Sequence, residues 1–340
     1  MNSSETLTPT VDELLGQLQV GALKNSQQAL TQAELDRTPE SPQAAELKSS
    51  AEVLLSAGDL GLARNILRTM IRQGVYVGWA LRTLGSTHEN EGRTDLARRC
   101  YQDAIAYEPH LEAYRLLASL EIRSRNDSAA ADATERALNL PHLSNRLRVE
   151  LHKVSGNCWM RSQKSERAEK HYQRALQLDP TDDSIASNLG ALYLQSGRIK
   201  DAVKSFEDAV TANPANAKAL AGLGSAQLAE GRKREAHDCL ARSLEIHLQQ
   251  PTTIYHLVKC AYEIKSYATA ARLLARYVEI APVNANLLYS LGGLQFHLGR
   301  IDEASRTVSK ILRIQPAHSG AAELQRLIQR YAQPGGTQKS

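Results

Sequence analysis

Apolar residues recur along this chain with helical spacing, and the helices that they predict come in pairs. In the segment 183–216, Leu189 and Tyr193 lie four positions apart on a first helix, and Ala202 and Phe206 have the same spacing on a second helix. Both stripes follow the period of a helix rather than the alternation of a strand. The pattern therefore predicts an all-α chain built from two-helix units.

The two-helix pattern repeats with an almost constant period. Eight alanines mark the same position of the second helix, at Ala63, Ala97, Ala130, Ala168, Ala202, Ala236, Ala270 and Ala304. Successive alanines are 34, 33, 38, 34, 34, 34 and 34 residues apart. This period is typical of helical repeats that must stack to bury their apolar faces. We assign eight repeats, to residues 44–77, 78–110, 111–144, 149–182, 183–216, 217–250, 251–284 and 285–318.

Three further positions recur in phase with the alanines. The first helix carries a small residue at Ala51, Gly85, Ala118, Gly156, Gly190, Gly224 and Gly292, and Val258 is the exception. A turn glycine follows at Gly58, Gly92, Gly197, Gly231 and Gly299, and is replaced by Arg125, Gln163 and Lys265. A proline closes the second helix at Pro109, Pro180, Pro214, Pro282 and Pro316. The small residue permits close helix approach, the glycine supplies the turn, and the proline ends the helix.

These residues resemble the tetratricopeptide repeat, and the resemblance covers residues 44–318. It implies a right-handed α-solenoid superhelix of helix-turn-helix units. It also implies that the first helices line a concave groove, which binds an extended peptide or a helix of another protein.

The segments outside the repeats have different expected roles. Residues 1–43 carry six acidic and two basic residues and a short amphipathic helix, predicted from a capping-box pattern at Thr10 and Glu13. This acidic segment either caps the first repeat, or docks on a partner or in the basic groove of the protein itself. Residues 319–331 are expected to form a capping helix, and 332–340 a disordered tail. The four extra residues 145–148 are expected to lengthen a loop, and a change of the superhelical angle is the alternative.

Composition favours a scaffold over an enzyme. The chain has 41 basic and 37 acidic residues, and this mild net charge of +4 gives weak support for a nucleic-acid partner. Its four cysteines have no metal-ligand spacing, so we expect them to be buried packing residues. No signal-peptide pattern and no apolar stretch near the ~20 residues of a membrane span is present, which favours a cytoplasmic protein.

Candidate catalytic chemistry is missing from the sequence. The ten histidines show no His-Glu-x-x-His spacing, and no phosphate-binding loop or nucleophile elbow occurs. We therefore expect no enzymatic activity, no cofactor and no metal.

The repeat register indicates which residues line the groove. The predicted peptide-binding residues are Arg82, Arg115, Arg123, Lys153, Asn157, Arg161, Asn188, Lys218, Tyr255, Lys259, Tyr262 and Tyr289. The cations in the middle, diluted by Glu89, Glu112 and Glu150, favour an acidic peptide or a C-terminal carboxylate. The tyrosines at the C-terminal end are candidate anchors, unless they pack between repeats.

Four of the predicted residues resemble the carboxylate clamp of heat-shock co-chaperones. Lys153, Asn157, Asn188 and Lys218 occupy matching positions, but Gly222 stands where that clamp has an arginine. Generic polar groove residues are the alternative interpretation. The leading hypothesis is a non-catalytic scaffold or adaptor, with a homo-oligomeric assembly factor and an RNA-binding helical repeat as the alternatives.

Overall fold

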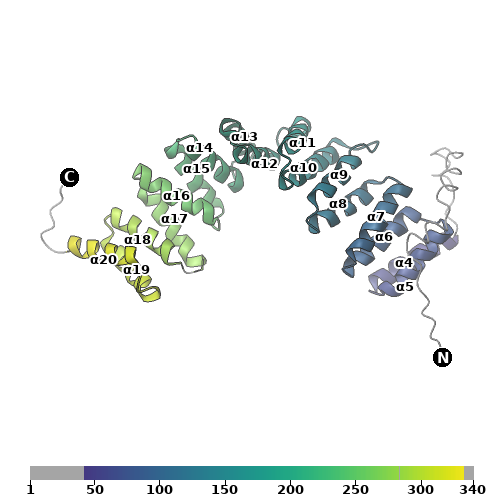
Figure 1. Ribbon diagram of the computed structural model, residues 1–340, viewed down its shortest axis with the longest axis horizontal. Helices are drawn as coiled ribbons and strands as arrows, with labels where there is room; N and C mark the ends of the chain where they lie inside the picture. The colour runs from purple at the N-terminus through teal and green to yellow at the C-terminus, as the bar shows by residue number, and fades with distance from the viewer. Residues whose placement is uncertain (1–41, 283, 333–340) are drawn as a thin grey trace, which may run out of the picture. The chain divides into compact units, whose positions relative to one another are not determined.

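The computed structural model describes residues 42–282 and 284–332, and these residues form seventeen α-helices and no strand (Figure 1). The helices are α4 (Pro42–Ser56), α5 (Leu60–Gln73), α6 (Val77–Asn90), α7 (Thr94–Tyr107), α8 (Leu111–Arg123), α9 (Asp127–Ala137), α10 (Asn145–Arg161), α11 (Ser165–Leu178), α12 (Asp183–Gln195), α13 (Ile199–Ala212), α14 (Ala217–Ala229), α15 (Lys233–Ile246), α16 (Pro251–Ile264), α17 (Tyr267–Ile280), α18 (Ala285–His297), α19 (Ile301–Ile314) and α20 (Ser319–Ala332). The predicted all-α repeat fold is confirmed.

The chain divides into two compact units between Lys164 and Ser165. The first unit contains α4 to α10, and the second contains α11 to α20. Within each unit, helices that follow one another in the sequence pack together, as α6 packs on α7 and α14 on α15. The division falls between α10 and α11, which are the two helices of the predicted repeat 149–182.

The eight alanines of the second helices lie in the core of their units. Each has a relative exposure of 0%, so their period marks the positions of closest packing. The small residue of the first helix lies under a large side chain from the second helix. A Cβ on Gly85 would come within 2.4 Å of the Tyr101 ring, and a Cβ on Gly224 within 2.7 Å of Leu240. Glycine is therefore required by the close approach of these helices.

The eight predicted turn positions all have left-handed backbone. The five turn glycines have φ between 73° and 82°. Arg125, Gln163 and Lys265 adopt the same conformation, with φ of 58° or 59°, although they carry a Cβ. Each closing proline stands two residues after the last residue of its helix, as Pro214 follows Ala212 in α13. The predicted turn chemistry is therefore confirmed.

The prediction of a loop at residues 145–148 is wrong. These residues form the first turn of α10, which has 17 residues where the other first helices have 13 to 15. Ser144 caps this longer helix by accepting a hydrogen bond from the amide of Leu147 at 3.3 Å.

The ends of the repeat array differ slightly from the predicted boundaries. Helix α4 begins at Pro42 rather than at residue 44, because proline suits the first position of a helix. Helix α20 covers the predicted capping segment and continues to Ala332. The predicted amphipathic helix near Thr10 lies outside the described residues, as does the predicted disordered tail 332–340 except for its first residue, Ala332, which ends α20.

Candidate functional site

The first unit contains an apolar pocket between two first helices, α8 and α10. Its volume is about 190 Å³. We call it the α8/α10 pocket, and it is lined by Leu111, Arg115, Ala118, Ser119, Ile122, Arg123, Thr134, Leu147, Glu150, Leu151 and Val154. Two of the predicted groove residues, Arg115 and Arg123, thus lie at the edge of an apolar hollow. Pockets with apolar walls and a few polar groups at the edge are typical of ligand sites.

The additional turn of α10 builds one wall of this pocket. Leu147 lies in that turn and lines the hollow together with Leu151 and Val154 from the following turns. Thr134 of α9 also lines the pocket, and a buried hydrogen bond of 2.7 Å between its Oγ1 and Ser155 Oγ joins α9 to α10. One of the four residues that break the repeat period, Leu147, therefore contributes directly to the pocket.

The same turn also contains two arginines, which precede and follow Leu147 in α10 and are not among the residues that line the pocket. Arg146 is exposed and Arg148 is half-buried, and neither forms an ion pair with any residue that the structure describes. The sequence analysis did not include Arg146, Arg148 or Leu147 among the groove residues, because it assigned them to a loop. The signal that could have found them is Ser144, since serine is a preferred N-cap residue.

The arginines at the edge of the pocket are engaged with acidic neighbours. Arg115 Nη2 lies 3.2 Å from Glu150 Oε1, and both side chains are about half exposed. Arg123 pairs with Glu89 of α6, and its Nη1 donates a hydrogen bond to Ser119 Oγ at 3.2 Å. The predicted basic patch is therefore partly neutralised in the first unit.

The remaining predicted residues of the first unit lie on α6 and α10. Arg161 donates two hydrogen bonds to Asp127 Oδ1, at 2.8 and 2.5 Å. Lys153 and Asn157 are half-buried on α10. Arg82 is half-buried on α6, and its Nη1 atom is buried without a hydrogen-bond partner.

In the second unit, two of the predicted clamp residues bind each other. Lys218 Nζ donates a hydrogen bond of 2.8 Å to Asn188 Oδ1, and Asn188 is buried. A Cβ on Gly222 would lie 2.3 Å from Cε1 of Phe206, so this backbone leaves no room for the arginine of a carboxylate clamp. The second unit thus lacks the space for the most directional contact of that clamp.

The three predicted tyrosines of the second unit differ in how far their rings contact other side chains. Tyr262 contacts the rings of Tyr267 and His297 at centroid distances of 5.7 and 5.6 Å, and its burial raises the pKa of its hydroxyl to about 12. Tyr289 contacts His318 at 5.3 Å. Tyr255 is 62% exposed, and Lys259 is exposed one turn further along α16. Tyr262 and Tyr289 therefore contact neighbouring rings while they remain 36% and 39% exposed, and Tyr255 is the most exposed of the three predicted tyrosines.

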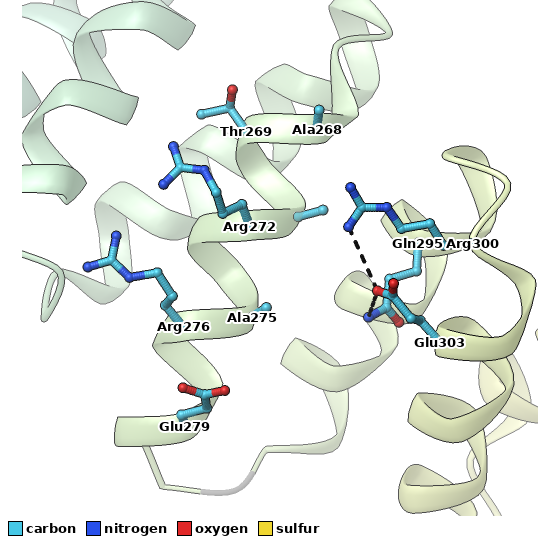
Figure 2. Close-up of a pocket in the computed structure, with 10 residues that line it drawn as sticks. Ala268, Thr269, Arg272, Ala275, Arg276, Glu279, Gln295, Arg300 and Glu303 are labelled. Atoms are coloured by element: carbon cyan, nitrogen blue, oxygen red, sulfur yellow. Dashed lines mark hydrogen bonds and ion pairs between the residues drawn. The ribbon is translucent and has the colours of Figure 1, made fainter.

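A second hollow, of about 460 Å³, lies between α17 and α19 and was missed by the sequence analysis. Figure 2 shows Ala275 on the side of α17 that is nearer to Arg300 and Glu303, whereas Arg272 and Arg276, which also line the hollow, extend from the other side of the helix. Both of these arginines bind the Glu245 carboxylate of α15. The sequence analysis considered only first helices, so these positions on second helices lay outside its candidates.

The four cysteines are free and buried, as expected. Burial raises the pKa of the Cys100 thiol to about 12 and that of Cys158 to about 11, so neither is a reactive thiolate. Within residues 42–282 and 284–332, no group of three or more histidine, cysteine and acidic residues is arranged to hold a metal ion. None of the helices in the same residues is long and apolar enough to cross a membrane.

Sequence models of the tetratricopeptide repeat match most of the described chain. One model matches residues 160–205, 194–258 and 261–328, and a second matches residues 82–144. The chain belongs to the tetratricopeptide repeat family. Tetratricopeptide repeat proteins generally mediate interactions between proteins. No curated protein matches the chain.

Several solved tetratricopeptide repeat structures are similar to the chain. PilF of Pseudomonas aeruginosa is 19% identical over 64% of this chain and 97% of its own, with a TM-score of 0.47. A repeat protein from Parabacteroides merdae is 15% identical over 74% of this chain and 98% of its own, with a TM-score of 0.48. YrrB, described as having an unusual peptide-binding site, is 21% identical over 58% and 99%, with a TM-score of 0.46.

Proposed function

We propose that this tetratricopeptide repeat protein is a non-catalytic scaffold that binds a segment of another protein on its first helices. The α8/α10 pocket carries the proposal, because it combines an apolar hollow with arginines at its edge. Its size and lining suit one aliphatic side chain of the bound segment. Burial of a leucine side chain contributes about 1.5–3 kcal/mol, which corresponds to about a tenfold to hundredfold gain in affinity.

The charges around the pocket favour acidic residues beside that apolar anchor. Arg146 and Arg148 precede and follow the pocket residue Leu147 in α10, and neither forms an ion pair with another described residue. The Arg115–Glu150 pair is half exposed, and such pairs contribute only about 0–1 kcal/mol. A ligand carboxylate can therefore replace Glu150 at little cost. We infer that the bound segment is amphipathic and acidic.

The other predicted groove residues remain part of the proposal, with different weights. Tyr255 and Lys259 are exposed on α16 and are available for contacts to a longer ligand. Lys218 and Asn188 satisfy each other, so we assign them a structural role in the second unit. We further propose a cytoplasmic location, because four free cysteines are typical of a reducing compartment.

Peptide display with counter-selection tests the proposal. A random library of 15-residue peptides is selected on the full chain and depleted on the Val154→Arg variant, which places a charge in the pocket. Val53→Arg on α4 is the matched control, because Val53 is 62% exposed and lies outside the pocket.

The expected peptides carry an apolar anchor flanked by acidic residues, and bind Val154→Arg at least about tenfold more weakly than the control variant. Selected peptides that bind Val154→Arg and Val53→Arg equally well would show that the pocket is not the binding site.

A further inference from the structure

We propose that the α8/α10 pocket is occupied by residues 10–20 of this same chain, which compete with a partner for the site. This inference rests on the proposed function, because it names an intramolecular ligand for the same pocket. The charges of the pocket, the pattern of the segment and the length of chain that joins them support it together.

The segment has the chemistry that the pocket selects. Its sequence, TVDELLGQLQV, carries Val11, Leu14, Leu15 and Leu18 with helical spacing. Asp12 and Glu13 stand between these apolar residues and supply carboxylates beside them. An apolar stripe flanked by acidic groups matches an apolar hollow whose lining includes Arg115 and Arg123.

The charge balance of the chain supports the pairing. Residues 1–43 carry six acidic and two basic residues, a net charge of −4, whereas the whole chain has a net charge of +4. Residues 44–340 therefore carry a net charge of +8, which is +4 minus −4. Residues 44–164, which contain the pocket, carry 17 basic and 14 acidic residues, a net charge of +3. Opposite net charges on a segment and on the unit to which it is tethered favour their association.

The connecting chain is long enough to reach the pocket. Four steps along the array separate α4 from α8, and packed helices are about 8–10 Å apart, so the span is about 40 Å. Residues 21–41 provide 21 residues, which extend to about 70 Å at about 3.3 Å per residue. The segment can therefore enter the pocket without displacing α4.

Tethering makes even weak docking effective. A connection of this length gives an effective concentration on the order of 1 mM. If the free segment has a Kd of about 100 μM, the tethered segment occupies the pocket in about nine molecules of ten and weakens competing ligands about tenfold.

The test uses the full chain and a labelled copy of its own segment. The probe is a fluorescein-labelled peptide of residues 8–20, TPTVDELLGQLQV, and its binding is followed by fluorescence anisotropy. Three proteins are compared: the wild type, Leu14→Asp/Leu15→Asp, and the same double variant with Val154→Arg. Ser3→Asp/Ser4→Asp is the matched control, because it adds the same charge outside the apolar stripe.

The double variant is expected to bind the probe about tenfold more tightly than the wild type and the serine control. Adding Val154→Arg is expected to abolish this gain. Equal binding by the wild type and the double variant overturns self-occupancy but leaves the pocket as a binding site. If none of the proteins binds the probe, self-occupancy is also overturned. The display experiment then decides whether the pocket binds a segment of another protein.

Sedimentation velocity tests whether the segment that fills the pocket comes from the same chain or from a second copy. The wild type is expected to sediment as a monomer at all concentrations. A mass that rises toward a dimer in the wild type, but not in Leu14→Asp/Leu15→Asp, would show that the segment docks on a second copy and would overturn the intramolecular proposal.

Discussion

Three turns of the repeat array store backbone strain that glycine would release. Arg125, Gln163 and Lys265 have φ of 58° or 59°, in the left-handed region, where the other repeats use glycine. All three side chains are exposed, so a change to glycine removes little packing. The substitutions Arg125→Gly, Gln163→Gly and Lys265→Gly therefore change mainly the backbone energy.

The expected gain follows from two opposing terms. Left-handed backbone costs a residue with a Cβ about 1–2 kcal/mol, and glycine avoids this cost. Glycine also raises the entropy of the unfolded chain, which destabilises the fold by about 0.4–1 kcal/mol and so offsets part of that gain. Each substitution is expected to stabilise the fold by about 0.5–1 kcal/mol. The three sites lie in different repeats, so the triple variant is expected to gain about 2 kcal/mol.

Urea unfolding followed by circular dichroism measures the gain, and two controls isolate its cause. Gly197→Ala is expected to destabilise by about 1 kcal/mol, because a Cβ there meets nothing within 4 Å and only the φ of 74° opposes it. Arg125→Ala keeps the Cβ and is expected to have little effect. An equal gain from Arg125→Ala and Arg125→Gly would refute the argument, since the lost side chain would then be responsible.

Three other contacts give further predictions, each measured by urea unfolding. Burial lowers the pKa of His88 to about 4, so the unfolded chain takes up a proton near pH 6.5 while the folded chain stays neutral. The free energy of unfolding should therefore fall by up to about 3 kcal/mol between pH 7 and pH 4, and His88→Gln should remove that part of the pH dependence. Arg98→Met should destabilise the first unit by about 3 kcal/mol, because it deprives the buried carboxylate of Glu121 of a 2.6 Å ion pair. Gly222→Ala should cost about 2 kcal/mol by pressing on the Phe206 ring, and Phe206→Leu in the same chain should recover part of it.

The turns show how far the sequence predicts this fold. The 34-residue period assigns a conformation to Lys265 that its residue type disfavours, and the backbone adopts it. The neighbouring repeats determine this turn, because the helices before and after it must both bury their apolar faces. Periodicity is therefore a stronger predictor here than the local preference of one residue.

The α8/α10 pocket shows where the sequence is insufficient. A surplus of four residues fixes a length but not its conformation, since a longer loop and a longer helix use the same number of residues. The cap at Ser144 decides in favour of the helix, and Leu147 then points into a pocket instead of a solvated turn. The volume of the pocket also depends on the separation of α8 and α10, which no pattern of residue types encodes.

The ion pairs of the first unit separate structural charges from those available to a ligand. Arg123 pairs with Glu89, and Arg161 pairs with Asp127, in both cases across 34 residues. Charges that recur at the repeat period thus meet across neighbouring repeats and join them. Arg146 and Arg148 lie in the residues that break the period, and they form no ion pair within the described part of the chain. Under the proposed function, the irregular turn therefore supplies charges for an acidic segment that the regular repeats have already used in ion pairs.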